Sequence, residues 1–166
     1  MISDQVRQGF PVATALEDRN PSFIAADAIQ AGQLVLYVEA PLITDVCRIL
    51  KNEFHFRLSG ITALDWYPIE PRFEIVYLVH SIERNERIRL KVKLAGDNAE
   101  MESVVSVWAG ANWYEREVFD LFGVKFRNHP NLIRIMMPEE WNGHPLRKDF
   151  PVHGYRYSYA DESNVI

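Results

Sequence analysis

The sequence predicts an α+β fold, in which a small mixed β-sheet is covered by helices and followed by an irregular, proline-rich C-terminal arm. Runs of strand length, rich in β-branched and aromatic residues, lie between residues 33 and 95. Two segments have apolar residues at helical spacing, and prolines then recur at positions 130, 138, 145 and 151. The 166 residues, 48% of them hydrophobic, suffice for one domain with a buried core. We therefore divide the chain into an α+β domain, residues 1–124, and an extended arm, residues 125–166.

The N-terminal segment, residues 1–30, is expected to form one short helix and a loop, interrupted by Pro11 and Pro21. Residues 33–39 are an apolar run with the length of a buried strand. A helix is expected to begin at Pro41, because proline suits a first helical position and a stripe of apolar residues follows at helical spacing. The stripe consists of Leu42, Val46, Ile49 and Leu50.

Three strands are expected next, over residues 58–66, 72–82 and 86–95. Residues 72–82 are apolar on both faces, which is typical of a strand in the interior of a sheet. A turn around Asn85 joins this strand to the next as a hairpin. In the last strand apolar and basic side chains alternate, with Ile88, Leu90, Val92 and Leu94 on one face and Arg87, Arg89, Lys91 and Lys93 on the other.

The row of basic side chains in residues 86–95 has two interpretations. It is a solvated face that also discourages edge-to-edge pairing of strands. Alternatively, it is a docking face for an acidic partner. The sequence leaves both open.

A further helix is expected over residues 113–122. Asn112 is a suitable N-cap, Glu115 three residues later completes a capping-box pattern, and Gly123 is a natural stop. Arg116 and Asp120 are four residues apart, which allows them to pair. The apolar arc of this helix consists of Tyr114, Val118, Leu121 and Phe122.

Two aromatic residues of the same helix, Trp113 and Phe119, fall outside this arc on separate sides. Such a helix is difficult to bury in the surface layer of a small domain. We therefore expect one side to pack on its own domain and another to meet a second protein. The alternative is an internal helix whose charges are paired.

The arm from residue 125 to 156 carries six Lys or Arg residues against three acids, within a chain whose net charge is −5. It is also rich in large apolar residues, which a disordered tail would not contain, so it packs along its own domain or another chain. The apolar residues are Leu132, Ile133, Ile135, Met136, Met137, Trp141, Leu146 and Phe150.

Several functional classes are disfavoured by composition. The net charge of −5 opposes a dedicated nucleic-acid-binding protein. The single cysteine, Cys47, can form neither an internal disulfide nor a four-thiolate iron–sulfur site, which favours a reducing, cytoplasmic compartment. Its place on a predicted amphipathic helix favours a packing role. The N-terminus does not read as a signal peptide, and no run approaches the roughly 18 apolar residues of a membrane span. Neither a G-x-G-x-x-G motif nor a Walker A loop is present.

Candidate chemistry is sparse. His129, His144 and His153 could converge on a metal, but their spacing matches no helical ligand pair, and we interpret them as hydrogen-bonding or surface residues. Glu115 and Glu117 could serve as an acid–base pair in a self-sufficient enzyme, which would require a concave pocket at the helix. A structural role for them is the preferred interpretation.

Residues 111–151 resemble a known family. They read ANWYEREVFDLFGVKFRNHPNLIRIMMPEEWNGHPLRKDFP and resemble the signature of the C-type subunit of bacterial NADH:quinone oxidoreductase, respiratory complex I. The family includes the mitochondrial counterpart and the J-type subunit of the cyanobacterial and chloroplast complexes. The matching positions are Glu115, Arg116, Glu117, Asp120, Gly123, Phe126, His129, Pro130, Leu132, Arg134, Ile135, Met137, Pro138, Trp141, His144, Pro145, Leu146, Arg147, Lys148 and Asp149.

The resemblance implies a non-catalytic structural subunit of the peripheral arm, on the cytoplasmic side of the inner membrane and without a membrane span of its own. It implies no cofactor in this chain, since NADH, FMN, iron–sulfur clusters and quinone are used in other subunits. The implied partners are chiefly the quinone-site (D-type) subunit and neighbouring cluster-bearing subunits, with no nucleic acid.

The predicted partner interface combines Trp113 with residues of the motif. Arg134, Arg147 and Lys148 are expected to make charge-assisted contacts with acidic groups of the partner, and the arm is expected to pack on partner subunits. An equivalent subunit of a membrane-bound hydrogenase or of a ferredoxin-fed quinone reductase is the alternative. The interface residues are Trp113, Glu115, Arg116, Glu117, Asp120, Gly123, His129, Pro130, Arg134, Met137, Pro138, Trp141, His144, Pro145, Leu146, Arg147, Lys148 and Asp149.

Overall fold

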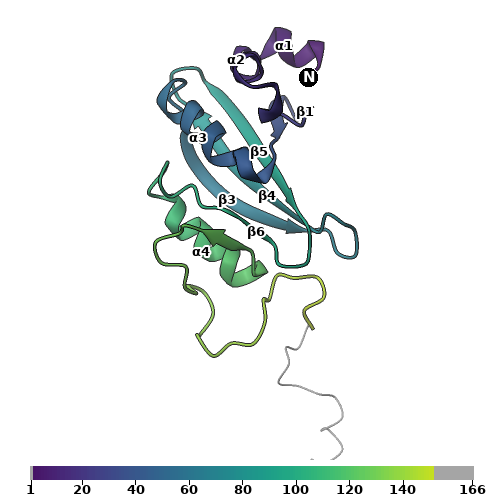
Figure 1. Ribbon diagram of the computed structural model, residues 1–166, viewed down its shortest axis with the longest axis vertical. Coiled ribbons are helices and arrows are strands. Elements are labelled where there is room, and N and C mark those ends of the chain that lie inside the picture. The colour runs from purple at the N-terminus through teal and green to yellow at the C-terminus, as the bar shows by residue number, and fades with distance from the viewer. Residues whose placement is uncertain (1, 152–166) are drawn as a thin grey trace, which may run out of the picture.

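The computed structural model describes residues 2–151, which contain a five-stranded sheet in the order β1-β2-β5-β4-β3 (Figure 1). The pair β2–β5 is parallel and the other pairs are antiparallel, which confirms the predicted mixed sheet. All three strands predicted after residue 57 are present, and their ends differ from the predictions by one residue at most. The strands are β1 (Ala26–Gln30), β2 (Gln33–Tyr37), β3 (Arg57–Asp65), β4 (Phe73–Ser81) and β5 (Glu86–Leu94).

The N-terminal segment contains more regular structure than predicted. Instead of one helix and a loop, it forms α1 (Asp4–Gly9), α2 (Pro11–Arg19) and the edge strand β1. Pro11 does not merely interrupt structure, because it occupies the first turn of α2, where a missing N–H is tolerated. β1 was missed because it is only partly buried and therefore has no apolar run.

The helix after β2 begins two residues later than predicted. Pro41 lies in a short 3-10 turn, Ala40–Leu42, and α3 (Ile43–Asn52) follows it. Cys47 is fully buried on the core side of α3, which confirms its packing role, and burial raises the pKa of its thiol far above the ordinary value.

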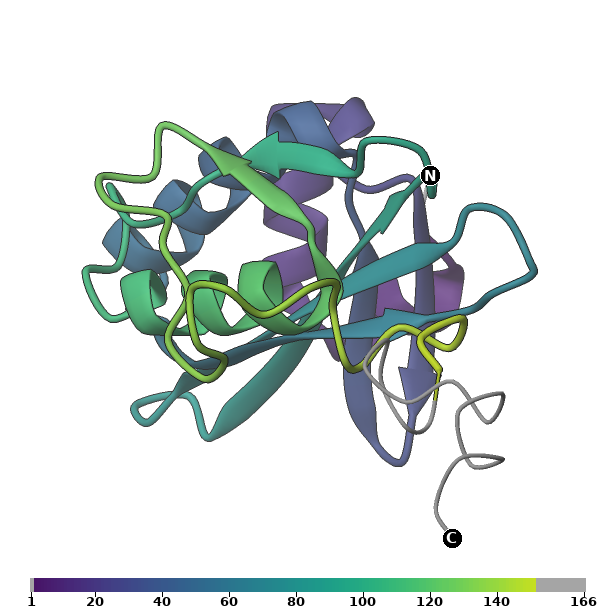
Figure 2. The same cartoon turned by 90° about the horizontal axis from the view of Figure 1, so that it is seen from below.

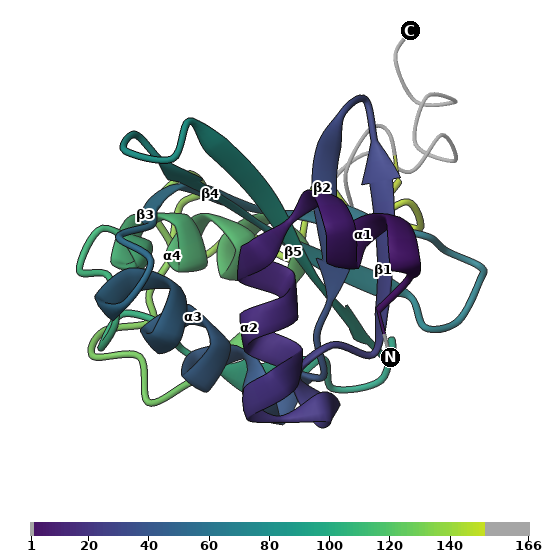
Figure 3. The ribbon, with the colours of Figure 1, turned by 90° about the horizontal axis from the view of Figure 1, so that it is seen from above.

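The core lies between the helices and one face of the sheet (Figure 3). β5 is the middle strand, and Ile88, Leu90, Val92 and Leu94 all point into this core, as the alternation predicted. Because β5 pairs on both sides, its basic side chains cannot protect a sheet edge. The interpretation of the basic row as edge protection is therefore wrong.

The C-terminal half adds a second, two-stranded parallel sheet formed by β6 (Glu100–Glu102) and β7 (Lys125–Arg127), with α4 (Ala111–Phe122) between them in the chain. Strands of three residues are too short to show an alternation, so the sequence did not reveal them. Figure 2 shows the irregular arm after β7 running along α4. The part of the predicted arm after residue 151, including His153, lies outside the described residues.

Candidate partner-binding surface

α4 ends as predicted but begins differently. Gly123 adopts a left-handed conformation, with φ of 77°, and its N–H donates to the carbonyl of Phe119 at 2.8 Å. The helix begins at Ala111, and the residue before it, Gly110, makes no side-chain cap. The predicted N-cap, Asn112, is wrong because it already lies in the first helical turn.

Glu115 turns into the protein instead of capping the helix. Its fully buried carboxylate accepts hydrogen bonds from the hydroxyl of Ser103 at 2.6 Å and the N–H of Val104 at 2.7 Å. Burial raises the pKa of Glu115 to about 7, although both hydrogen bonds favour the charged form. Glu115 therefore fastens the segment after β6 to α4. Since its side chain has no exposed surface, its assignment as a contact residue for a partner is wrong.

Asp120 is the anchor of the arm. Its Oδ2 accepts the backbone N–H groups of Ile135, Met136 and Met137 at 3.0, 2.7 and 2.9 Å. Its Oδ1 pairs with Arg134 at 2.7 Å, and the Asp120 side chain is 0% exposed. Burial alone would raise the pKa of Asp120, but these hydrogen bonds outweigh it and lower the pKa. Asp120 is thus an internal anchor and not the partner contact that was predicted.

The predicted Arg116–Asp120 pair is also wrong. Arg116 donates instead to the carbonyls of Ile133 and Arg134 in the arm, at 3.0 and 3.2 Å. Arg134, expected to contact a partner, directs its guanidinium to Asp120 and to the carbonyls of Trp141 and Gly143. Both arginines therefore hold the arm to its own helix, because the arm folds back within reach of α4.

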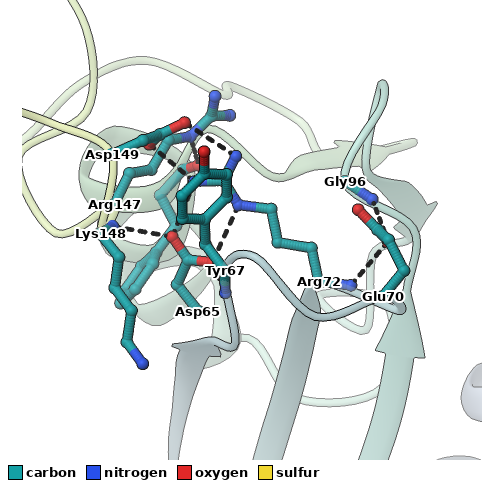
Figure 4. Close-up of polar contacts among 9 residues, drawn as sticks. Asp65, Tyr67, Glu70, Arg72, Gly96, Arg147, Lys148 and Asp149 are labelled. Carbon is teal, nitrogen blue, oxygen red and sulfur yellow. Dashed lines mark hydrogen bonds and ion pairs between the residues drawn. The ribbon is translucent and has the colours of Figure 1, made fainter.

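A second anchor fixes the arm at the end of β3 (Figure 4). Arg72 donates to both carboxylate oxygens of Asp65 at 2.8 Å and to both of Asp149 at 2.7 and 2.9 Å. The N–H of Lys148 also donates to Asp65 at 2.8 Å. Burial opposes ionisation of Asp65, but the hydrogen bonds from Arg72, Lys148 and Tyr67 lower its pKa to about 2. Asp149 thereby contacts its own domain across 77 residues of sequence.

Gly123 lies where the arm crosses the end of α4. His144 donates through Nδ1 to the carbonyl of Asp120 at 2.9 Å, and Arg147 donates to the carbonyl of Phe122. These two bonds satisfy carbonyl groups that the helix end leaves unpaired. A Cβ at position 123 would lie 2.5 Å from Nε2 of His144 and would also meet the Arg147 guanidinium. Only glycine allows this close crossing.

Replacing Gly123 by alanine is expected to lower the free energy of unfolding by about 2 kcal/mol, because left-handed strain adds to the displacement of His144 and Arg147. Urea denaturation followed by circular dichroism measures this loss. Gly32→Ala is the matched control, since Gly32 also has a positive φ, of 74°, but nothing within 4 Å of a new Cβ. Equal losses in the two variants would show that the crossing of the arm contributes nothing.

Comparison with known protein families matches the part of the chain that contains α4, the two anchors and the arm. The model of the family described as respiratory-chain NADH dehydrogenase, 30 Kd subunit, matches residues 36–156. The chain belongs to this family. The resemblance found in the sequence is therefore confirmed. The match includes α4, both anchors and the arm as far as it is described.

Two relatives in the 30 Kd family illustrate the similarity. The chain is 44% identical over 125 residues to the C-type subunit of the NADH-quinone oxidoreductase of Geobacter sulfurreducens, covering 74% of this chain and 77% of the relative. It is 41% identical over 159 residues to the C-type subunit of the Roseiflexus castenholzii enzyme, covering 93% of this chain and 91% of the relative.

Two solved structures share the fold. A trypsin-resistant fragment (1–134) of Nqo5 superposes with a TM-score of 0.64 at 25% identity, covering 73% of this chain and 98% of the fragment. A chain of the membrane-bound sulfane sulfur reductase, an archaeal respiratory membrane complex, superposes with a TM-score of 0.75 at 28% identity, covering 96% of this chain and 92% of that chain. Over residues 2–151 this family member has no helix long and apolar enough to cross a membrane.

Four large apolar side chains on α4 and the arm remain exposed after both anchors are made. We call them the apolar patch: Trp113, Ile133, Met136 and Leu146, with exposed fractions between 47% and 63%. Phe119, the other aromatic residue outside the helical arc, contacts the ring of His144 and so faces the arm. α4 thus packs on the core and on the arm, and the side that carries Trp113 is left uncovered within residues 2–151.

The other predicted interface residues divide between backbone anchors and open positions. The N–H of Met137 donates to the carboxylate of Asp120, and Nε2 of His129 donates to the carbonyl of Asn112 at 3.2 Å. Arg147 is occupied within the chain, whereas the side chains of Glu117 and Lys148 are exposed. Whether the following residues contact a partner stays a prediction: Arg116, Glu117, Pro130, Pro138, Trp141, Pro145 and Lys148.

The enzymatic alternative required Glu115 and Glu117 to share a pocket. Glu115 is fully buried against Ser103, whereas Glu117 is exposed on α4, so the two carboxylates do not face one cleft. Among residues 2–151 no three His, Cys, Asp or Glu side chains come together as metal ligands. His129 and His144 instead make the hydrogen bonds described above, and His153 lies outside the described residues.

Three residues that build this surface were not recognisable in the sequence. Ser103, Asp65 and Arg72 lie outside the motif, yet they hold Glu115 and Asp149. Asp65 ends β3 and Arg72 directly precedes β4, so both resemble ordinary residues at strand ends. The only available signal was their charge complementarity across a short connection.

Proposed function

We propose that this chain is a non-catalytic structural subunit in the peripheral arm of a proton-pumping NADH:quinone oxidoreductase, where it supports the quinone-site (D-type) subunit during electron transfer from NADH to quinone. Its neighbours would include cluster-bearing subunits on the cytoplasmic side of the inner membrane. NADH, FMN, the iron–sulfur clusters and quinone would be bound by other subunits.

The observation that carries this proposal is the apolar patch, which lies on α4 and on the doubly anchored arm. Large apolar side chains that stay exposed on a folded chain are candidates for protein–protein contact. The anchors at Asp120 and Asp65 hold the irregular arm in place through hydrogen bonds to its backbone. An arm that is ordered before binding loses less conformational entropy on association, so its apolar side chains contribute more to affinity.

The buried groups support a structural role. Glu115 is enclosed by Ser103 and Val104, and the Cys47 thiol is fully buried with a strongly raised pKa, which disfavours the reactive thiolate. Glu115 therefore joins the segment after β6 to α4, Cys47 packs in the core, and neither side chain is accessible to a substrate in solvent.

Replacing Trp113 by alanine is expected to weaken association with the quinone-site subunit by at least about 30-fold, because exposed tryptophans at interface centres are frequent hot spots. The isolated chain should keep its free energy of unfolding within about 0.5 kcal/mol, since Trp113 is 63% exposed and its ring is covered by the Arg116 guanidinium, 5.0 Å from the ring centre. Affinity purification of the tagged chain from its own host, with quantification of co-purified subunits and NADH oxidation, measures the association.

Ile82→Ala is the control for this variant, because Ile82 is similarly exposed, at 67%, but lies at the β4–β5 turn away from the arm. The proposal predicts normal assembly for Ile82→Ala and depleted complexes for Trp113→Ala. Normal recovery of the quinone-site subunit with Trp113→Ala would contradict the assigned surface. Recovery of the wild-type chain alone would contradict the role as a subunit.

A second candidate is the equivalent subunit of a related complex with another electron donor. The similarity to a chain of the archaeal sulfane sulfur reductase, which covers 96% of this chain, supports this second candidate. The same purification separates the two, because flavin- and cluster-bearing subunits that oxidise NADH support the first candidate. A hydrogenase or ferredoxin-fed module in their place supports the second.

A further inference from the structure

The sheet has a second face that the helices of residues 2–151 leave largely uncovered, although Tyr114 of α4 reaches it at Gly60. Side chains alternate across a strand, so those that do not join the core point to the opposite side. Val35 and Val76 are buried, yet they are absent from the core that contains their strand neighbours. α1, α2 and α3 all lie over the other face (Figure 3), and α4 contributes Val118 and Phe122 to that same core.

The centre of this second face is positively charged. We call it the basic face: Arg87, Arg89, Lys91 and Lys93 on β5, with the flanking apolar residues Val35, Tyr37, Val76 and Leu78. One acid, Glu74, pairs with Lys91 at 2.8 Å, and both side chains of this pair are largely buried. Within residues 2–151 the other three cations make no ion pair.

This arrangement is unusual for an acidic protein. The chain has a net charge of −5, but three unpaired cations stand in one row on the middle strand of its sheet. Like charges in a row repel one another, so the isolated chain gains nothing from the spacing. An opposing row of carboxylates would turn this repulsion into attraction.

The surroundings of the row indicate the class of partner. Leu78 lies beside Arg89 in the sheet and Leu64 lies on the same face of β3, and both leucines are exposed. On the β2 side of the row, Tyr37, Lys91 and Lys93 line a hollow of 240 Å³. The ammonium groups of Lys91 and Lys93 lie 5.7 and 5.4 Å from the centre of the Tyr37 ring. Glu39 also lines this hollow.

A polypeptide suits this surface better than a polyanion does. The row from Arg87 to Lys93 is about 20 Å long at strand spacing, which matches a short acidic segment. The leucines beside it can accept apolar side chains, which a phosphate backbone lacks. The negative charge of the whole chain opposes both nucleic acid and an anionic membrane.

We propose that the basic face docks on an acidic segment of a neighbouring subunit in the same respiratory complex, as a second contact separate from the apolar patch. The inference rests on the proposed function in so far as the neighbour belongs to that complex. Carboxylates of the segment pair with Arg87, Arg89 and Lys93, and separate apolar side chains rest on Leu78 and on Leu64.

The test uses the assembled complex, with a photo-crosslinking amino acid in place of Leu78 in one strain and of Met136, in the apolar patch, in another. The proposal predicts that position 78 links to a segment rich in Asp and Glu on another subunit. In the charge-reversed double variant R87E/R89E this product should fall at least tenfold, and in R87Q/R89Q it should fall less. R48E is the control, because Arg48 is an exposed cation on α3, on the opposite side of the sheet.

Circular dichroism of the isolated variants checks that they fold. If R87E/R89E fails to fold, the cross-link from position 78 in the otherwise wild-type chain still tests whether the basic face contacts an acidic segment. No product, or a product with lipid, nucleic acid or this chain itself, overturns the inference. A link from position 136 but none from 78 overturns it while leaving the proposed function intact. A link from 78 to an acidic neighbour but none from 136 supports it and counts against the apolar patch as a contact. Absence of both links overturns both.

Discussion

Replacing Asp120 by alanine is expected to lower the free energy of unfolding by about 4 kcal/mol, because it breaks a buried ion pair on one side only. The change leaves Arg134, only 17% exposed, without its carboxylate and leaves three consecutive N–H groups of the arm without an acceptor. Buried donors that lose their acceptor cost more than the hydrogen bonds contributed. The arm should therefore leave α4 and become open to proteases.

Urea denaturation and limited proteolysis of the full chain measure the two consequences. Glu117→Ala is the control, because Glu117 lies on the same helix but is exposed, and its effect should stay within about 0.5 kcal/mol. Because the pKa of Asp120 is lowered in the folded protein, the stability that Asp120 contributes depends on pH. Its contribution is present above the unfolded-state pKa and is lost as the pH falls through the folded-state pKa, so the gap between wild type and variant should shrink in acid. A stable variant with a protected arm would refute the anchor.

Replacing Glu115 by glutamine is expected to raise the free energy of unfolding at high pH, whereas replacing Asp120 lowers it. The pKa of Glu115 is raised from 4.5 to about 7, so the folded protein retains a proton that the unfolded chain releases between these values. Stability consequently falls as the pH rises through this range, by about 3 kcal/mol in total. Glutamine remains neutral and can keep the contacts with Ser103 and Val104, so the variant should avoid this loss.

Parallel urea titrations of wild type and Glu115→Gln from pH 5 to pH 8 measure the difference. The two proteins should be similarly stable near pH 5, and the variant should become the more stable one by about 3 kcal/mol near pH 8. Glu117→Gln, exposed on the same helix, should follow wild type. Curves for Glu115→Gln that run parallel to wild type would show that folding does not raise the pKa of the Glu115 carboxyl group.

Much of the fold was predictable from local pattern. The alternation in residues 86–95 correctly indicated the core face of β5, and Gly123 correctly marked the end of α4. Such features were accessible because each depends on residues within a turn or a strand of one another. β1, β6 and β7 were missed because they are short or partly exposed and leave no periodic signal.

The candidate surface was predictable only in outline. The motif located it on α4 and the arm, but assigned the acids and arginines to a partner. Glu115 satisfied the capping-box pattern and Asp120 the spacing of a helical pair, yet both are buried against residues 11 to 17 positions away. Local rules failed here because a fully desolvated carboxylate takes the donors that the folded chain brings to it.

By itself, the sequence determined the class of fold, the place of the main helix and strands, the family, and the apolar residues that the arm carries. Only the tertiary structure decided which charged groups are internal and which remain open. Charges are assigned by desolvation and by partners distant in sequence, such as Asp65 with Lys148, 83 residues apart. A helix or strand follows from neighbouring residues, whereas the state of a charge depends on what the whole chain places around it.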